Sequence, residues 1–251
     1  MLVSTEGIVL RRTLYGDTSI ITSILTQEKG KISIIAKGAR RPKNPIASLL
    51  EPPNILNLQF YHKETRNIQI LKEASFSQRL SGIRNQLEKI HYALSIVEIV
   101  EKTSRDNEIL PIIYRLTNRC LCALNSQHTK DDTLFIFFLL QLSIRSGFMP
   151  DLSICCHCGS ELSPAALDLV SGELVCDKCR LQESPLISEE SLELLRLLVH
   201  TNIDDLGSLV CEKYHTIELI AFLNSFAKIH LEGMKYIKSL NLLQELFDGS
   251  L

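Results

Sequence analysis

The chain has 251 residues, 45% of them hydrophobic and 22% charged, which is ordinary for a globular protein that buries a core. The N-terminus does not look like a signal peptide and the longest apolar run, residues 134–140, is too short to span a bilayer, so we expect a cytoplasmic protein, with no membrane partner and with reduced cysteines. The formal charge of −2 is uneven: residues 1–50 carry eight Lys or Arg against three acids, which suggests a polyanion-binding module on an acidic body.

Residues 1–78 are predicted to form a small β-barrel. Runs rich in Ile, Val, Leu and Thr recur at 3–10, 18–26, 31–37, 54–61 and 67–73, with turn residues between them. The fourth run alternates apolar and polar side chains, which is the period of a half-buried strand. A short apolar patch at 46–50 fits a small helix after the third strand. Five strands with a helix there is the plan of an OB-fold, although other small barrels share the strand count.

Cationic side chains concentrate in KGARRPK, residues 37–43, between the third strand and the short helix. Loops at the mouth of an OB-fold and the face of its middle strands bind oligonucleotides, and Lys or Arg there neutralises phosphates. The candidate contacts are Lys37, Arg40, Arg41 and Lys43, with Arg11, Arg12, Lys29 and Lys31 adding charge around the same groove. The alternative is a solvated loop whose charge only maintains solubility.

From residue 79 the hydrophobic period becomes helical, and we expect an α-helical domain over 79–251. One helix should bury a face made by Leu87, Ile90, Leu94 and Val97. The next should begin near Pro111 and bury a face made by Ile113, Leu116, Cys120 and Ala123.

A third helix should begin at Asp131-Asp132 and end at Gly147, and its apolar character on most sides predicts the centre of a bundle. Ser188, followed by two glutamates, is a helix start signal. The last amphipathic face combines Leu219, Phe222, Phe226 and Ile229. Cys120, Cys122 and Cys211 fit as small core residues within helices.

A cysteine-rich insert at about 150–182 interrupts these helices. Cys155 and Cys158 form one C-x-x-C pair, and Cys176 and Cys179 form a second pair after 17 intervening residues. Two such pairs predict one tetrahedral Zn²⁺ per chain, and four thiolates leave no open coordination position, so the site should be structural. We treat Cys156 and His157 as non-ligands because a C-x-C pair makes a poorer knuckle.

Enzymatic activity is not expected. The acid pairs Asp131-Asp132 and Asp204-Asp205 read as helix caps or loop charges rather than as a metal-binding nuclease centre. The sequence contains no Walker-type loop, and nothing in it indicates a Ser-His-Asp arrangement. An OB-fold protein with a zinc module that acts on RNA or in transcription remains the alternative, because phosphate contacts do not separate DNA from RNA.

Three stretches resemble the RecO family of bacterial recombination mediators over nearly the whole chain: YGDTSIITSILTQEKGKISIIAKGARRPKN, SGFMPDLSICCHCG and SGELVCDKC. One departure is Asn44-Pro45, where the family pattern would have a serine. The resemblance implies an N-terminal OB-fold, an α-helical domain and an inserted four-cysteine zinc module, an α+β multidomain plan. Lys37, Arg40, Arg41 and Lys43 then become DNA contacts, and Cys155, Cys158, Cys176 and Cys179 become zinc ligands.

The resemblance also implies a role in the RecFOR pathway without catalysis, in a bacterial, nucleoid-associated protein. RecO-like proteins bind single- and double-stranded DNA and anneal complementary strands. They contact RecR and the C-terminal tail of the single-stranded-DNA-binding protein, and thereby help RecA replace that protein on DNA. A cation beside an apolar pocket should receive the tail; Arg115, Arg119 and Arg145 are unranked possibilities.

Overall fold

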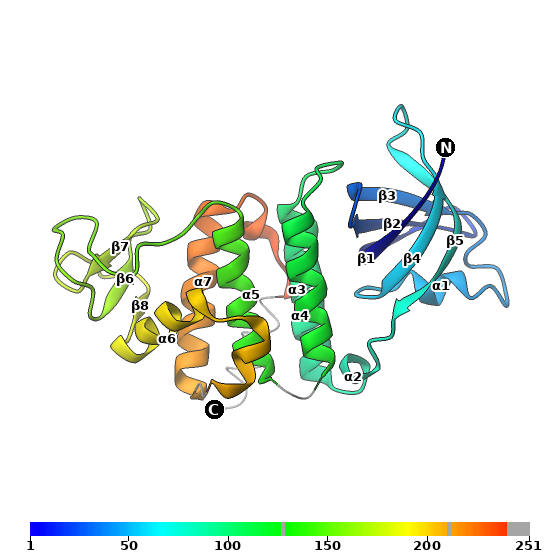
Figure 1. Cartoon of the computed structure of the whole chain (residues 1–251). Coiled ribbons are helices and arrows are strands. Elements are labelled where there is room, and N and C mark those ends of the chain that lie inside the picture. The colour runs from blue at the N-terminus through cyan, green and yellow to red at the C-terminus, as the bar shows by residue number, and fades with distance from the viewer. Residues whose placement is uncertain (127–128, 210–211, 240–251) are drawn as a thin grey trace. The chain divides into compact units, whose positions relative to one another are not determined.

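The computed structural model describes residues 1–126, 129–209 and 212–239, so Cys211 lies outside the described residues. The chain divides into two compact units. The first contains Met1–Asn125 and the described residues from 237 onward, and the second contains the described residues from 126 to 236 (Figure 1). The predicted division into an OB-fold over 1–78 and an α-helical domain over 79–251 stays a prediction.

The first unit begins with a closed barrel of five strands. These are β1 (Leu2–Tyr15), β2 (Ser19–Thr26), β3 (Gly30–Ala36), β4 (Ile55–Tyr61) and β5 (Ile68–Gln78), with α1 (Ile46–Leu49) following β3. Their order is β1-β2-β3-β5-β4, and β4 closes the barrel on β1. The β3–β5 pair is parallel and the others are antiparallel. The predicted OB-fold, including its helix after the third strand, is confirmed.

β1 and β5 are longer than the sequence pattern indicated. β1 pairs with β4 through its first half and with β2 through its second half, so it must bend as it passes from one partner to the other. The bend coincides with a register shift between Val9 and Arg11, which is the usual effect of a β-bulge. The extension of β1 was not predicted because the residues beyond position 10 are mostly polar and the prediction followed apolar runs.

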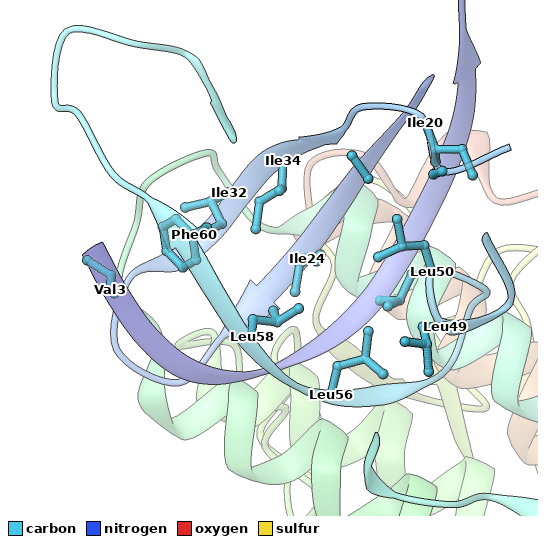
Figure 2. Close-up of a cluster of buried hydrophobic side chains, with 13 residues drawn as sticks. Val3, Ile20, Ile24, Ile32, Ile34, Leu49, Leu50, Leu56, Leu58 and Phe60 are labelled. Atoms are coloured by element: carbon cyan, nitrogen blue, oxygen red, sulfur yellow. The ribbon is translucent and has the colours of Figure 1, made fainter. Parts of the chain in front are cut away.

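Alternating side chains fill the barrel. Leu56, Leu58 and Phe60 are buried inside it, while Asn57 and Tyr61 between and beyond them are exposed. Figure 2 shows the inward-pointing side chains of four strands and α1 meeting in one cluster. Burial of this cluster is the main source of stability for the barrel, since removing apolar area from water contributes about 25 cal/mol per Å².

Three helices complete the first unit: α2 (Ser81–Arg84), α3 (Leu87–Thr103) and α4 (Pro111–Asn125). The start of α4 at Pro111 and its buried face are as predicted, except that Ala123 is only partly buried. The predicted buried face of α3 was wrong at two of its four positions: Val97 is buried, but Leu87 is 65% exposed and Leu94 is 37% exposed. The buried side of this helix centres instead on Tyr92, Ala93 and Ile96, because α3 packs on β1, α2 and α4 together.

The segment between α3 and α4 covers one end of the barrel. Gly30 lies in the left-handed region (φ +67°), and a Cβ there would meet the carbonyl oxygen of Glu108 at 1.9 Å. The neighbouring Lys31 accepts a backbone hydrogen bond from Asn107 (2.8 Å). This close backbone approach explains why glycine opens β3 and joins the barrel to the helices that follow it.

The second unit is built from α5 (Asp131–Arg145), α6 (Glu189–His200), η1 (Ile203–Ser208), α7 (Lys213–His230), η2 (Met234–Tyr236) and a small sheet. The sheet contains β6 (Ala165–Leu167), β7 (Leu174–Cys176) and β8 (Leu186–Ile187) in the order β7-β6-β8. α5 is buried from Thr133 to Ser143, as its apolar sequence predicted, and packs on α6 and α7.

Two further predictions for this unit can be compared with the structure. Ser188 caps α6 by accepting a hydrogen bond from the backbone of Ser191, as predicted. On α7, Leu219, Phe222 and Phe226 are buried, while Ile229 is 36% exposed. Across the described ranges, no helix is both long and apolar enough to cross a membrane.

Candidate nucleic-acid interface and metal centre

Three of the four cations in residues 37–43 are available to a ligand. Lys37, Arg41 and Lys43 are exposed, and none of them forms an ion pair within the described residues. The loop turns sharply, with positive φ at Gly38 (69°) and at Lys43 (65°). The sharp turns bring the three cations onto a short, solvent-facing loop beside the end of β3.

Arg40 differs from its neighbours because its side chain binds the protein itself. Its Nη2 donates hydrogen bonds to the carbonyl oxygens of Gly16 (2.6 Å) and Asp17 (2.5 Å) in the β1–β2 turn. Its backbone N–H donates to the carbonyl of Thr18 (2.9 Å). Arg40 therefore fastens the basic loop to the adjacent turn, a role that the run of cations in the sequence does not reveal.

The other cationic candidates lie mostly in ion pairs. Arg11 pairs with Glu101 of α3 (2.9 Å), and Arg12 pairs with Glu51. Lys31 is buried; its Nζ donates to the carbonyl of Glu101 (2.9 Å) and lies 3.2 Å from Asp106. Charges neutralised in this way attract a phosphate less than free ones. Lys29 is half-buried and, within the described residues, forms no ion pair.

Aromatic side chains near the barrel surface are few. Phe60 belongs to the core, as expected of an inward strand position, while Tyr15 (56%) and Tyr61 (49%) are exposed. Lys63 and Arg66 lie in the loop after Tyr61, where the sequence predicted only a turn. The sequence feature that could have singled out this loop is a second group of cations directly after an aromatic residue.

The four cysteines of the two C-x-x-C pairs meet in one cluster. The sulfur atoms of Cys155, Cys158, Cys176 and Cys179 all lie within 4.8 Å of one another. The Sγ atoms of Cys158 and Cys176 are 3.7 Å apart. A tetrahedral zinc with Zn–S bonds of about 2.3 Å separates its sulfurs by about 3.8 Å, so this spacing fits one ion held by four thiolates.

Backbone geometry forms both halves of the cluster. The N–H of Gly159 donates to the carbonyl of Cys155 (2.9 Å), and that of Cys179 donates to the carbonyl of Cys176 (3.0 Å). Gly159 has positive φ (69°) and closes the first knuckle. Cys156 is exposed and outside the cluster, and the imidazole of His157 lies 3.3 Å from Asp168 instead.

The thiols share their protons unequally. A hydrogen bond from Ser160 is the main influence that lowers the pKa of Cys176 to about 6. Hydrogen bonding to Cys158 and then Cys176 raises the pKa of Cys179 to about 12. Cys176 therefore ionises readily while Cys179 retains its proton, and a bound cation would remove that proton because metal ligation requires thiolates.

The polar cluster nearest in composition to a hydrolase centre is a helix cap. Ser188 and Ser191 both donate to the carboxylate of Glu218, and Nδ1 of His215 lies 2.9 Å from the hydroxyl of Ser191. Ser191 is completely buried, so no substrate can reach its hydroxyl. A nucleophile needs access to its substrate, and this cluster instead stabilises the start of α6.

A closed five-stranded barrel with three unpaired cations on one loop, followed by helices that carry a four-cysteine cluster, places the chain in the class of oligonucleotide-binding-fold proteins with a cysteine module that could hold a metal ion. Two family models match it: Recombination protein O N terminal over residues 1–79, and Recombination protein O C terminal over residues 84–240. The chain belongs to the RecO family.

Curated relatives agree over most of the length. The chain is 30% identical to the DNA repair protein RecO of Pelodictyon phaeoclathratiforme over 98% of this chain and 99% of that protein. It is 25% identical to the DNA repair protein RecO of Bacillus subtilis, with 98% of each chain covered. A match to the DNA repair protein RecO of Salinibacter ruber reaches 38% identity and spans 59% of this chain and 57% of that protein.

Proposed function

We propose that this protein is a recombination mediator that binds single- and double-stranded DNA and anneals complementary strands during repair. Its family gives the broader role, DNA repair and recombination. The observation that carries the proposal is the set of unpaired cations at Lys37, Arg41 and Lys43 on an OB-fold barrel. Binding through phosphates is tolerant of base sequence, which suits a protein that must act wherever DNA is damaged.

The finer role includes protein partners. With RecR, the protein would help RecA load onto strands coated by single-stranded-DNA-binding protein, whose C-terminal tail it would bind, in the cytoplasm near the nucleoid. None of these steps requires covalent chemistry on DNA, and we propose that the protein is not an enzyme. In the described ranges, the grouping of His, Cys, Asp or Glu side chains suited to a metal ion is the four-cysteine cluster, which lacks an open ligand position.

The four thiolates of Cys155, Cys158, Cys176 and Cys179 would hold one structural Zn²⁺. When bound, the ion would supply a cross-link between the segment before β6 and the end of β7 with the turn that follows it, and its binding free energy would become folding free energy. The residues around it keep the knuckles in shape and take no part in DNA chemistry.

The direct test is the salt dependence of DNA binding in matched charge variants. The variant R41Q/K43Q removes two loop cations, and K213Q/K235Q removes two exposed cations from the second unit as the control. If about four to six phosphates are neutralised, log affinity for a single strand should fall with log salt at a slope of roughly −3 to −4. The loop variant should reduce the magnitude of that slope by about 1.4, while the control should leave it unchanged.

Fluorescence anisotropy with a labelled oligonucleotide would measure both slopes, with an RNA oligomer of the same sequence as competitor. Equal slopes for the wild type and the loop variant would show that the loop is only a solubilising surface. Preference for the RNA competitor would favour a role in RNA biology. A pull-down from bacterial lysate, probed for RecR, would test the partner, and the loop variant should still retain it.

A further inference from the structure

The charge of the chain is divided between its two units. Residues 1–125 carry 18 Lys or Arg against 11 Asp or Glu, a formal charge of +7, whereas residues 126–236 carry eight against 16, a formal charge of −8. Opposite potentials of this size attract complementary surfaces, and a second copy of the same chain supplies both signs. Charge alone does not fix how two proteins meet, so a specific contact also needs apolar surfaces that fit each other.

The acidic unit carries an apolar projection on the turn between the strands labelled β6 and β7 in Figure 1. We call residues 168–173 the hairpin tip. Val170 is 86% exposed and Leu169 is 46% exposed, although both are aliphatic. Glu173 follows them on the same turn and is exposed as well. The hairpin tip therefore presents two adjacent aliphatic side chains together with a carboxylate.

Hydrogen bonds hold the hairpin tip in one conformation. The carboxylate of Asp168 accepts from the backbone N–H of Val170 (3.0 Å) and from the hydroxyl of Ser171 (2.9 Å), and its carbonyl accepts from the N–H of Gly172 (2.8 Å). Gly172 has positive φ (75°), and its carbonyl oxygen lies 2.9 Å from Nε2 of His230 on α7. A tip that is already ordered loses little conformational entropy on binding, which favours its use as a docking element.

The basic unit contains an apolar groove between the second half of β1 and α3. We call it the β1–α3 groove; its volume is about 720 Å³. Leu14 of β1 is 54% exposed and Leu94 of α3 is 37% exposed, and both line the groove. The remaining apolar lining comes from Leu10, Pro52 and Val97. Two large aliphatic side chains are thus left open to solvent beside a hollow that can receive others.

Cations outnumber acids among the charged residues that line this groove. They are Arg11, Arg12, Lys102 and Lys238 against Glu51, Glu98 and Glu101. The carboxylate of Glu98 already accepts from the backbone N–H groups of Lys238 (3.1 Å) and Ser239 (2.9 Å), which reduces its effect on an incoming acid. An aliphatic projection with a carboxylate beside it therefore complements the groove in shape and in charge.

We infer that the hairpin tip of one copy docks in the β1–α3 groove of a second copy, where its two aliphatic side chains contact Leu14 and Leu94. The inference goes beyond the proposed function, because it concerns assembly in the absence of DNA, and the basic loop at 37–43 lies outside the groove. The two surfaces differ, so the contact is heterologous. Each further copy can then add to the free tip or the free groove, in an open row or a closed ring.

The experiment measures self-association of the 251-residue chain by sedimentation velocity without DNA, over a range of protein concentrations. V170E places a charge on the hairpin tip and L94E places one in the groove, with L14E as a second groove variant. L197E on α6 and L87E on α3 are the matched controls, because both leucines are exposed and lie outside the two surfaces. Loss of one buried aliphatic contact should weaken association roughly 10- to 150-fold, whereas the controls should associate as the wild type does.

V170E also separates docking from simple attraction between net charges. The substitution makes the acidic unit more acidic, so charge attraction alone would strengthen association, whereas docking of the tip requires association to weaken. Wild-type association should decrease when salt rises from about 0.1 M to about 1 M, since the screening length falls from about 10 Å to about 3 Å.

Mixing the variants tests which surface meets which. V170E copies retain an intact groove, and L94E copies retain an intact tip. An equimolar mixture should therefore form one contact and sediment as a dimer, although each variant alone stays monomeric. A contact between two like surfaces would not be restored by mixing.

Three results would overturn the inference: a wild-type chain that is monomeric at every concentration and salt, a V170E variant that associates as the wild type does, or a mixture that forms no dimer. Circular dichroism of each variant would show that a loss of association does not come from unfolding. DNA binding by the basic loop enters none of these readings, so the inference and the proposed function stand or fall separately.

Discussion

Arg40 and Arg41 are adjacent in the sequence, but replacing each by alanine should affect a different property of the protein. Arg40 donates to the carbonyls of Gly16 (2.6 Å) and Asp17 (2.5 Å), whereas Arg41 is exposed and, among the described residues, has no ion pair. We expect R40A to lower stability with little effect on DNA affinity, and R41A to lower DNA affinity with little effect on stability.

The magnitude for Arg40 follows from its contacts. A hydrogen bond from a charged group contributes about 1.5–3 kcal/mol when well shielded. Both bonds here come from one nitrogen at an exposed site, and Nε of Arg40 is buried without a partner, so its removal offsets part of the loss. A net cost of about 1–2 kcal/mol is reasonable, which corresponds to a Tm lower by roughly 4–8 °C in a unit of this size.

For Arg41 the expected change in unfolding free energy is within about 0.5 kcal/mol, because its side chain contributes no such contact. Loss of one phosphate contact should instead reduce the single-strand salt slope by about 0.7. Thermal unfolding by circular dichroism and anisotropy at several salt concentrations give the two readings. Equal Tm values for R40A and R41A, or an equal change in slope, would refute the division of roles between these arginines.

Three further predictions concern the four-cysteine cluster, the carboxylate of Glu98 and the fragment of residues 1–78. C176S should lose the one zinc per chain and destabilise residues 150–185, whereas C156S should keep the zinc. Elemental analysis of both variants would measure the metal content. A wild-type protein that is folded but free of metal would contradict the zinc assignment. The carboxylate of Glu98 accepts from the backbone N–H groups of Lys238 (3.1 Å) and Ser239 (2.9 Å). Burial alone would raise the pKa of Glu98, but these hydrogen bonds outweigh it and lower the pKa below 4.5. The pKa of Glu98 is lower in the folded state than in the unfolded state, so the stabilisation should be present above about pH 4.5 and disappear as the pH falls through the folded-state value. E98Q should therefore unfold more easily than the wild type at pH 7 and not at pH 3. A difference in stability between the two proteins that stays constant over this range would contradict the prediction. A fragment of residues 1–78 is predicted to fold alone as the OB-fold, yet it exposes Gly30 and Lys31, so it should melt below a fragment of residues 1–125.

Local patterns in the sequence predicted most of the fold. Alternation in β4, the proline at the start of α4, the serine cap of α6 and the apolar length of α5 each depend on neighbours along the chain, and each agrees with the structure. The pairing of C-x-x-C motifs likewise anticipated the cluster of four thiols. Such features are visible because the interaction and the pattern share a short stretch of sequence.

Features that depend on contacts between distant segments could not be predicted from the sequence. α3 turns its Leu87 and Leu94 toward solvent because it contacts three elements, and periodicity alone cannot say which side they cover. The sequence predicted Lys31 as a surface cation, but in the structure it contacts Glu101 and Asp106, about 70 residues further along the chain. Arg40 is engaged by a turn 23 and 24 residues earlier. In each case tertiary contact, rather than local chemistry, sets the role of the residue.

The way the basic loop is closed affects how DNA binding would be driven. Asn44 donates from Nδ2 to the carbonyl of Gly38 (2.9 Å), and its Oδ1 accepts from the backbone of Ile46 (3.0 Å). Together with Arg40, this asparagine orders the loop while the protein folds. Ordering a loop at the moment of association costs affinity, so a loop that is already ordered loses less conformational entropy on meeting a phosphate backbone. Flexible DNA would then supply most of the adaptation, and the protein would act as a fixed template along which strands of any sequence can be aligned.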